Sequence, residues 1–402
     1  MSHVYRSYTP VHTILAEQES HYYINNNKVL SFSFILSLIL AVHSTNMKVV
    51  CQRIPCASET LQLKLTLGGG QSFRWKEIKD GKWRGVFLNK VWTLWNDKEF
   101  LYYEVESGTP NPSKSSKRIK SSTLPGDSQL NDEDLLQSYL RLDVPLQKFY
   151  SEWSKSDPLF EKVSNDFLGV RLLNQDVVEN IFSFICSSNN NIIRISSMVE
   201  KLCLFYGNEI ATVDGIKYYS FPKVTALADP SVESKLRSAG FGYRAKFIQQ
   251  SAEKIVELGE EAWLTNLQKL PYIDAKKELM KLAGIGAKVA DCICLMSLNH
   301  LEAIPVDTHV FQIAQRYMPH LKKCKTVTDK VYNEIGEYFR SLYGVYAGWA
   351  HTILFCADLR KFQDVPTNKE HTIESIKETK KAAAMKRKNA PTKTAVKKAK
   401  RK

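Results

Sequence analysis

One segment limits the fold of this chain more than any other, and it reads LAGIGAKVADCICLM over residues 282–296. A Gly-x-Gly turn, Gly284 to Gly286, joins two stretches with helical periodicity, so we predict a helical hairpin over residues 275–298. Glycines let a backbone approach a phosphate closely, and the amides that begin the second helix point toward an anion. Such a hairpin grips a nucleic-acid backbone without reading its sequence. Many helical hairpins need glycine for packing alone, so the turn by itself leaves that alternative open.

Helical periodicity extends over most of the second half of the chain. We expect Asp274 to cap the first hairpin helix. The face of that helix that should be buried consists of Ala275, Leu279 and Leu282. An earlier helix should end at Gly207, and its buried positions should be Ile192, Ile195, Val199 and Leu202.

The region from Leu61 to Val105 has the patterns of strands instead. Residues 61–65 (LQLKL) alternate apolar and polar, a Gly68–Gly70 run marks a turn, and the segments KWRGVF and KVWTLW are rich in β-branched and aromatic residues. A polar stretch over residues 108–134 then predicts a loop or insertion. The fold should therefore be α+β, with a small antiparallel sheet followed by a helical body.

Four segments are predicted along the chain. They are an unplaced extension (1–46), a β-rich domain (47–145), a helical domain (146–361) and a disordered basic tail (362–402). An apolar run at 29–42 is too short to cross a membrane comfortably and lies late for a signal peptide. We therefore favour a misplaced start codon or an unstructured extension over a targeting signal.

The formal net charge of +14 is concentrated in the tail. Residues 380–402 hold 11 basic side chains and no acidic one, which leaves +3 for everything else. The charge therefore predicts a tail that attracts nucleic acid and says little about the folded body. Eight scattered cysteines without C-x-x-C spacing argue against a zinc site or an iron–sulfur cluster, and they indicate a reducing compartment.

Lys288 lies in the first turn of the second hairpin helix, where the helix dipole disfavours a cation. Loss of its proton is therefore eased, and a neutral lysine amine is the nucleophile that Schiff-base chemistry needs. A phosphate-binding or solvated lysine is the alternative. Cys292 lies one turn later on the same face, either as a thiolate beside the ammonium or as an ordinary buried residue.

Asp307 follows Pro305 in AIPVDTHV, 19 residues after Lys288. Because proline cannot continue a helix, we expect Asp307 to be the N-cap of the next one. A carboxylate there is also a candidate for stabilising positive charge on a sugar and for assisting proton transfer. The two roles are compatible.

Two further segments have side chains suited to a ligand. Asparagines 189–191 precede an amphipathic helix, where they can cap that helix or offer donors and acceptors on short arms. The segment FGYRAKF places Tyr243 beside Arg244. Such a pair can stack in a duplex and reach a base, or it can be ordinary surface decoration.

Taken together, these segments resemble the eukaryotic 8-oxoguanine DNA glycosylases from about Ile54 to Leu359. The matching stretches are GQSFRW (70–75), FSFICSSNNN (182–191), GYRA (242–245), KVADCICLM (288–296), IPVD (304–307) and YAGWA with LF (346–350, 354–355). Several motifs in order are far more specific than any one of them. The resemblance implies a sheet domain like half of the TATA-binding protein, a helix-hairpin-helix body, and no metal or organic cofactor.

The same resemblance implies roles for individual residues. Lys288 would be the nucleophile and Asp307 the catalytic carboxylate. Gly70 would offer its carbonyl to the N7 hydrogen of the lesion, where guanine has only an acceptor. The other residues facing the flipped base would be Cys292, Met296, His351 and Phe355. The phosphate contacts would come from Gly284, Gly286 and His309, and those to the opposite cytosine from Asn189, Arg194, Tyr243 and Arg244.

The chain departs from the family pattern at Ala283, where proline is usual, and at His351, where glutamine is common. A glutamine amide matches both donors and acceptors of a base edge, whereas neutral histidine satisfies fewer of them. Either specificity depends mainly on Gly70 and the Lys288–Cys292 pair, which we favour, or excision falls as the pH drops through about 6.5.

These expectations describe a base-excision enzyme that flips out 8-oxoguanine opposite cytosine, removes it, and cleaves the abasic strand through a lysine Schiff base. Its partner would be duplex DNA. We expect a monomer without membrane association, in the nucleus, with a mitochondrial form through residues 1–46 as the weaker alternative. Two rivals are a glycosylase for alkylated bases or mismatched adenine, and a DNA-binding module without catalysis.

Overall fold

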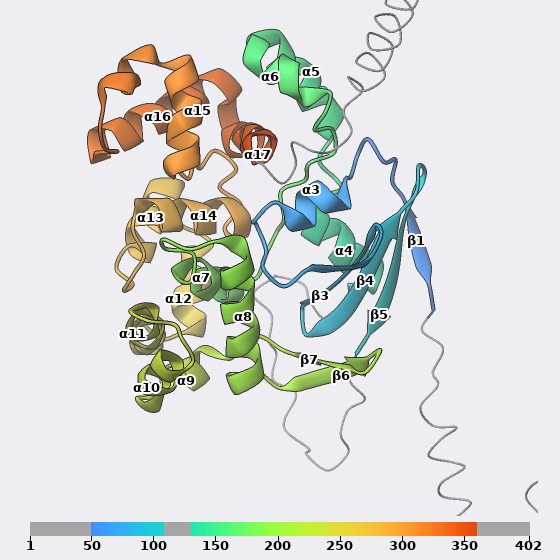
Figure 1. Cartoon of the computed structure of the whole chain (residues 1–402), viewed down its shortest axis with the longest axis vertical. Coiled ribbons are helices and arrows are strands. Elements are labelled where there is room, and N and C mark those ends of the chain that lie inside the picture. Colours follow the sequence, from blue (N-terminus) through green and yellow to red (C-terminus); the bar gives the residue numbers. More distant parts are fainter. Residues whose placement is uncertain (1–49, 108–129, 360–402) are drawn as a thin grey trace, which may run out of the picture. The chain divides into compact units, whose positions relative to one another are not determined.

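The computed structural model describes residues 50–107 and 130–359 (Figure 1). The extension over 1–46, most of the polar insertion and the basic tail after 361 therefore lie outside the described residues. Within the described part, no helix is both long enough and apolar enough to cross a membrane.

The N-terminal part is a five-stranded antiparallel sheet with the order β1-β5-β4-β3-β2. Its strands are β1 (Gln52–Pro55), β2 (Lys76–Lys79), β3 (Lys82–Phe87), β4 (Lys90–Asn96) and β5 (Phe100–Glu106). Alternating side chains separate its two faces: Trp92 and Leu94 enter a core with α4 (Asp132–Leu140), while Val91 points to the other face. Strands are thus confirmed for both KWRGVF and KVWTLW.

The expectation of a strand over residues 61–65 is wrong, because this segment begins the helix α3 (Leu63–Gly68). The helix is buried on opposite sides. Leu63 and Leu67 pack in the core of the sheet, and Leu65 packs in the core of the helical body. A short helix shared by two cores has few exposed positions, so its sequence imitates the alternation of a strand. The predicted turn follows directly, since Gly70 has a φ of +87°.

The polar insertion ends earlier than residue 134. Asn131 accepts a hydrogen bond from the backbone N–H of Asp134, and the Asp134 side chain accepts one from the backbone of Asn131. This reciprocal capping box starts α4 at Asp132. The last residues of the predicted insertion therefore belong to a helix.

The second part is built from packed helices around one large core. Its first elements are α5 (Leu146–Ser156), α6 (Pro158–Ser164), α7 (Val177–Ile185), α8 (Ile192–Tyr206), α9 (Val224–Leu227), α10 (Ser231–Ser238) and α11 (Arg244–Glu257). The later ones are α12 (Glu261–Leu267), α13 (Tyr272–Leu279), α14 (Ala287–Ser297), α15 (Thr308–Tyr317), η1 (Pro319–Lys323), α16 (Asp329–Tyr343), η2 (Gly344–Tyr346) and α17 (Ala347–Asp358). The predicted stop of α8 at Gly207 is confirmed.

A hairpin of β6 (Glu209–Val213) and β7 (Ile216–Tyr219) interrupts the helices, in a region expected to be helical throughout. Val213 packs against Val86 and Val91 on the outer face of the sheet. Arg84 on β3 also pairs with Asp214 at 2.7 Å. The hairpin therefore covers part of the sheet face that α3 and α4 leave open.

The predicted helical hairpin is present as α13 and α14 with Gly284–Gly286 between them. Ala275, Leu279 and Leu282 are buried, as expected. The predicted cap is wrong, however, because α13 begins after Pro271 and Asp274 lies within its first turn. The helix therefore starts three residues earlier than the predicted cap implies.

Candidate active site

One pocket brings together residues from distant parts of the sequence. It lies between the Gly69–Gln71 turn, the helices α7, α14 and α17, and the loop before α15. It is lined by seven of the predicted site residues, which are Gly70, Lys288, Cys292, Met296, Asp307, His351 and Phe355. The pocket thus gathers every residue assigned from the sequence to the chemistry or to the flipped base.

Lys288 lies in the first turn of α14, as predicted, and its side chain is half-buried. Its Nζ atom lies 5.2 Å from the centre of the Phe184 ring on α7. An ammonium over an aromatic face is held by the ring quadrupole, which fixes the position of a long and flexible side chain. The Nζ atom is thereby held against Phe184, which lines the same pocket.

Cys292 is buried one turn after Lys288. Burial raises the pKa of its thiol to about 11, although the neighbouring Lys288 ammonium opposes this shift. The raised pKa favours a neutral thiol. Of the two alternatives for Cys292, a buried packing residue therefore agrees better with the structure than a thiolate beside the ammonium.

Asp307 is the N-cap of α15, where its Oδ1 accepts a hydrogen bond from the backbone N–H of Val310 at 2.9 Å. The predicted capping role is confirmed. The same side chain lines the pocket that Lys288 enters. Because the helix fixes the carboxylate by this bond, its position does not depend on a bound ligand.

His351 on α17 is buried, and no hydrogen-bond partner reaches its Nε2 atom in the described structure. Burial lowers the pKa of its imidazole to about 4, opposed by the Asp307 carboxylate. The ring packs edge-on against Phe339 with 5.6 Å between centroids. This lowered pKa argues against the alternative in which excision falls as the pH drops through about 6.5, and the pH dependence of excision tests it.

His309 is not among the residues that line the pocket, but it contacts one of them. It is exposed in the first turn of α15, and its ring meets Phe355 of α17 edge-on at 6.1 Å.

Gly70 lines the pocket from the turn after α3, where an added Cβ would be strained by the positive φ and would lie 3.2 Å from Ile192.

A second cluster lies at the start of α8 and α11. Asn191 caps α8, which confirms the capping function of the asparagine run. The hydroxyl of Tyr243 donates to the Ser188 carbonyl at 3.1 Å, and Arg244 donates to the carbonyls of Ser188 and Asn189. Asn189 itself has a φ of +45°, so its side chain is presented by a strained turn.

Arg194 joins the same cluster, since its guanidinium donates to the Gly240 carbonyl at 3.3 Å while the side chain stays exposed. Arg244 is buried instead, and Tyr243 is 46% exposed beside it. The structure therefore brings the four residues predicted to contact the opposite base together. Arg244 also supports the turn at Asn189, because its guanidinium donates to the carbonyls of that turn.

The two hairpin glycines differ in what they require. Gly284 has a φ of +80°, and a Cβ there would lie 2.6 Å from the ring of Phe247 on α11. Gly286 is the exposed N-cap of α14 and has no atom within 4 Å of an added Cβ. Gly284 thus serves the fold, and Gly286 leaves open space where the amides of α14 begin.

Several pocket residues were missed from the sequence. They are Gln71, Phe184, Leu295, Pro305, Val310 and Thr352. Gln71 is buried, donates to the Arg171 carbonyl at 2.8 Å and accepts from the Leu173 amide at 3.0 Å. Phe184 and Pro305 lie inside segments already singled out, so proximity to those motifs was the available signal.

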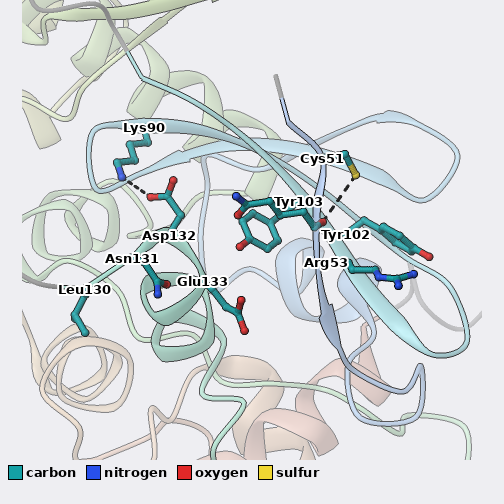
Figure 2. Close-up of a pocket in the computed structure, with 10 residues that line it drawn as sticks. Cys51, Arg53, Lys90, Tyr102, Tyr103, Leu130, Asn131, Asp132 and Glu133 are labelled. Carbon is teal, nitrogen blue, oxygen red and sulfur yellow. Dashed lines mark hydrogen bonds and ion pairs between the residues drawn. The ribbon is translucent and has the colours of Figure 1, made fainter. Parts of the chain in front are cut away.

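A second hollow opens beside β1, β5 and the start of α4 (Figure 2). Lys90 pairs there with Asp132, and Arg53 and Tyr102 line the opposite side. None of the predicted site residues lines it. Among the described residues, no group of three or more His, Cys, Asp and Glu side chains is arranged to hold a metal ion.

Comparison with known families covers most of the chain. Residues 53–181 match the model of the 8-oxoguanine DNA glycosylase N-terminal domain, and residues 182–341 match that of the HhH-GPD superfamily of base excision DNA repair proteins. The N-glycosylase/DNA lyase OGG1 of Arabidopsis thaliana is 37% identical over 74% of this chain and 78% of its own length. The chain belongs to the 8-oxoguanine DNA glycosylase/lyase family. It is a base-excision repair enzyme.

Other relatives agree with this membership. The N-glycosylase/DNA lyase of Saccharomyces cerevisiae is 40% identical over 61% of this chain and 72% of its own length. The structure of MBOgg1 with a low-affinity DNA ligand superposes with a TM-score of 0.65 at 28% identity, covering 79% of this chain and 98% of that one. The 8-oxoguanine glycosylase/lyase of Clostridium acetobutylicum, bound to duplex DNA with cytosine opposite 8-oxoguanine, gives 0.61 at 27% identity, covering 77% and 98%. The expected α+β architecture of a sheet followed by a helix-hairpin-helix body is confirmed.

Proposed function

We propose that this chain removes 8-oxoguanine paired with cytosine from duplex DNA and then cleaves the abasic strand, with Lys288 and Asp307 as its catalytic residues. The observation that carries this proposal is the single pocket in which a lysine amine, a fixed carboxylate and the Gly70 turn face one another. A DNA-binding module has no need for this constellation.

The reaction needs the damaged nucleoside outside the base stack, because its sugar carbon is inaccessible within a duplex. Lys288 attacks C1′ as a neutral amine, and the glycosidic bond breaks with its electron pair leaving on the base, which takes up a proton. Asp307 stabilises the positive charge that develops on the sugar. The amine then loses a proton and the C1′–O4′ bond breaks, with O4′ taking up a proton, so that C1′ becomes a Schiff base. Loss of a 2′ proton follows, and the 3′ phosphate leaves by β-elimination.

Recognition of the lesion depends on one atom. The N7 position carries a hydrogen in 8-oxoguanine and only a lone pair in guanine, so a carbonyl acceptor at Gly70 favours the oxidised base. Cys292 and Phe355 provide the faces between which the base would lie. A neutral thiol suits this role because it costs less to bury against a ring than a thiolate.

Duplex DNA is held on both strands in this proposal. Gly284, Gly286 and His309 contact phosphate, and the cluster of Asn189, Arg194, Tyr243 and Arg244 contacts the cytosine left behind. Guanidinium donors match the acceptors of cytosine, whereas adenine offers a different edge. No metal or organic cofactor enters the chemistry.

We further propose that the enzyme works as a monomer in the nucleus, away from membranes, with the basic tail over 380–402 directing import and adding affinity that does not depend on sequence. The tail carries 11 basic residues without an acid. A reporter fused to the full chain should lose nuclear accumulation when the tail is deleted, while base excision continues. A mitochondrial form directed by residues 1–46 is the alternative. Fusing that segment alone to a reporter and locating the reporter in the cell tests it.

Borohydride trapping tests the chemistry. The wild-type enzyme should form a covalent adduct with duplex DNA carrying 8-oxoguanine opposite cytosine, and Lys288→Gln should lose the adduct, excision and strand cleavage while still binding the lesion. Lys281→Gln is the matched control, since Lys281 is an exposed lysine of the same hairpin that pairs with Glu278. Normal turnover of Lys288→Gln would refute the proposed mechanism.

A further inference from the structure

Asp291 is a buried carboxylate on the helix that carries Lys288, and the proposed mechanism does not use it. It lies between Lys288 and Cys292 in α14, is excluded from solvent, and is absent from the lining of the base pocket. A charge in this position needs partners, because an unpaired buried carboxylate is strongly unfavourable. Its partners therefore reveal what the residue holds together.

Three side chains from two other helices satisfy this carboxylate. Tyr272 donates to Oδ1 at 2.8 Å, and Lys276 donates to Oδ2 at 2.8 Å, both from α13. Tyr332 of α16 donates to Oδ2 at 2.5 Å. We call these four residues the Asp291 network. Its lysine is 15% exposed and lies 4.7 Å from the ring centre of Tyr332, so the charges are held in fixed places.

Tyr332 connects this network to the loop before α15. Its hydroxyl accepts a hydrogen bond from the backbone N–H of Val306 at 3.3 Å and lies 3.3 Å from the carbonyl oxygen of Ile304. Val306 is the residue directly before Asp307. The hydroxyl thus uses its proton toward Asp291 and its lone pair toward the backbone that leads into the catalytic carboxylate.

We propose that Tyr332 is a positioning residue for base excision, which sets the Asp307 carboxylate against Lys288 by anchoring the Ile304–Val306 backbone to Asp291. The proposal depends on the catalytic roles assigned above to Lys288 and Asp307. The two groups come from different elements, α14 and the N-terminus of α15, and among the residues that the structure describes no hydrogen bond joins them directly. Tyr332 and Asp291 form a path between those elements that consists only of buried or half-buried contacts.

The physical reason is the steep dependence of reaction rate on geometry. A carboxylate that stabilises a developing charge loses much of its effect when it moves by a fraction of an ångström, and a displacement of about 1 Å can cost about a hundredfold in rate. Loss of one anchoring hydrogen bond should move the Asp307 carboxylate by less than about 1 Å. We therefore expect a decrease of about tenfold in the rate of excision.

The test compares two hydroxyl deletions that are chemically identical. Tyr332→Phe and Tyr272→Phe each remove one hydrogen bond to Asp291, but only Tyr332 reaches the loop before Asp307. Under single-turnover conditions with 8-oxoguanine opposite cytosine, Tyr332→Phe should slow excision about tenfold, with the Kd for the duplex changed less than twofold. Tyr272→Phe should stay within twofold of wild type in both quantities, at a similar loss of Tm. Equal rates in the two variants would overturn the proposal and leave the network a structural one.

A double-mutant cycle then asks whether Tyr332 acts through Asp307. In an Asp307→Asn background, adding Tyr332→Phe should change the residual excision rate by less than twofold, because the group being positioned has lost its charge. An undiminished tenfold effect in that background would also overturn the proposal. These failures are separate from failure of the proposed function, which shows itself when Lys288→Gln or Asp307→Asn retains normal turnover.

Discussion

At the scale of single residues, His351 is a pocket residue for which the sequence left two alternatives open. Its imidazole is buried without a partner for Nε2, and its pKa is lowered to about 4. The flipped base would therefore meet a neutral ring throughout the physiological range. A neutral ring matches fewer donors and acceptors of a base edge than a glutamine amide does, so we expect discrimination from guanine to depend mainly on Gly70.

We predict that His351→Gln changes 8-oxoguanine excision and discrimination against guanine by less than about threefold between pH 5.5 and 8. The reason is that neither side chain changes its charge there. Excision rates on paired lesion and guanine duplexes across this range are the measurement. Loss of discrimination in the variant would make His351 a primary reader of the base.

The same residue should make stability depend on pH. The folded pKa is about 4, below the ordinary value of 6.5, so the unfolded chain binds the proton first as the pH falls. The free energy of unfolding should therefore decrease below about pH 6.5, by about 2 kcal/mol at pH 5, and remain unaffected above it. Urea unfolding at pH 7.5 and 5 should reveal this slope in wild type and a shallower one in His351→Gln. Parallel slopes would show that His351 has the same pKa in the folded and unfolded chains.

At the scale of elements, Asp307 both caps α15 and serves the pocket, and two substitutions separate these duties. Asparagine caps as well as aspartate, so Asp307→Asn should keep its Tm and slow excision by about a hundredfold or more. Asp307→Ala should show the same slow chemistry and lose about 1 kcal/mol of stability. Thermal unfolding and single-turnover excision measure the two effects. An Asp307→Asn enzyme with full activity would leave the cap as the only role.

The two hairpin glycines form a second matched pair. Gly284→Ala should lose about 2 kcal/mol of stability, because a Cβ at a φ of +80° is strained and meets the ring of Phe247. Gly286→Ala should fold normally, since nothing lies near its Cβ, and should weaken DNA binding by obstructing the approach of a phosphate. Unfolding and binding titrations on both variants test this. Unchanged DNA affinity in Gly286→Ala would place the phosphate elsewhere.

The sequence alone was sufficient to predict some elements of the fold and not others. Local motifs predicted the hairpin and the cap at Asp307, because those features need specific side chains at short spacings. The members of the pocket lie as far apart as Gly70 and Phe355, and only the resemblance to a known family brought them together. The helix α3 was mistaken for a strand because both of its faces are buried, and burial depends on two cores that no local pattern reveals. The Asp291 network was invisible for the same reason, since its members lie up to 60 residues apart.

At the scale of the whole molecule, the two clusters should act on one duplex, and the base opposite the lesion should matter. We predict a clear preference for cytosine, and Arg194→Ala should weaken that preference by about tenfold, since one matched donor set is worth about 1–3 kcal/mol. Excision opposite cytosine and opposite adenine, compared in wild type and variant, is the measurement. Equal excision of both pairs by wild type would mean that Arg194 binds only phosphate.

The helix α11 connects the two groups of residues that we propose as DNA contacts. Tyr243 and Arg244 stand at its start, one turn later Phe247 lies beneath Gly284, and Ser251 donates to the Ala283 carbonyl at 2.8 Å. One helix therefore fixes the distance between the residues proposed to contact phosphate and those proposed to contact the unpaired base. We expect a double helix of another width, such as the A-form hybrid of DNA with RNA, to fit both sets of contacts less well and to be bound more weakly.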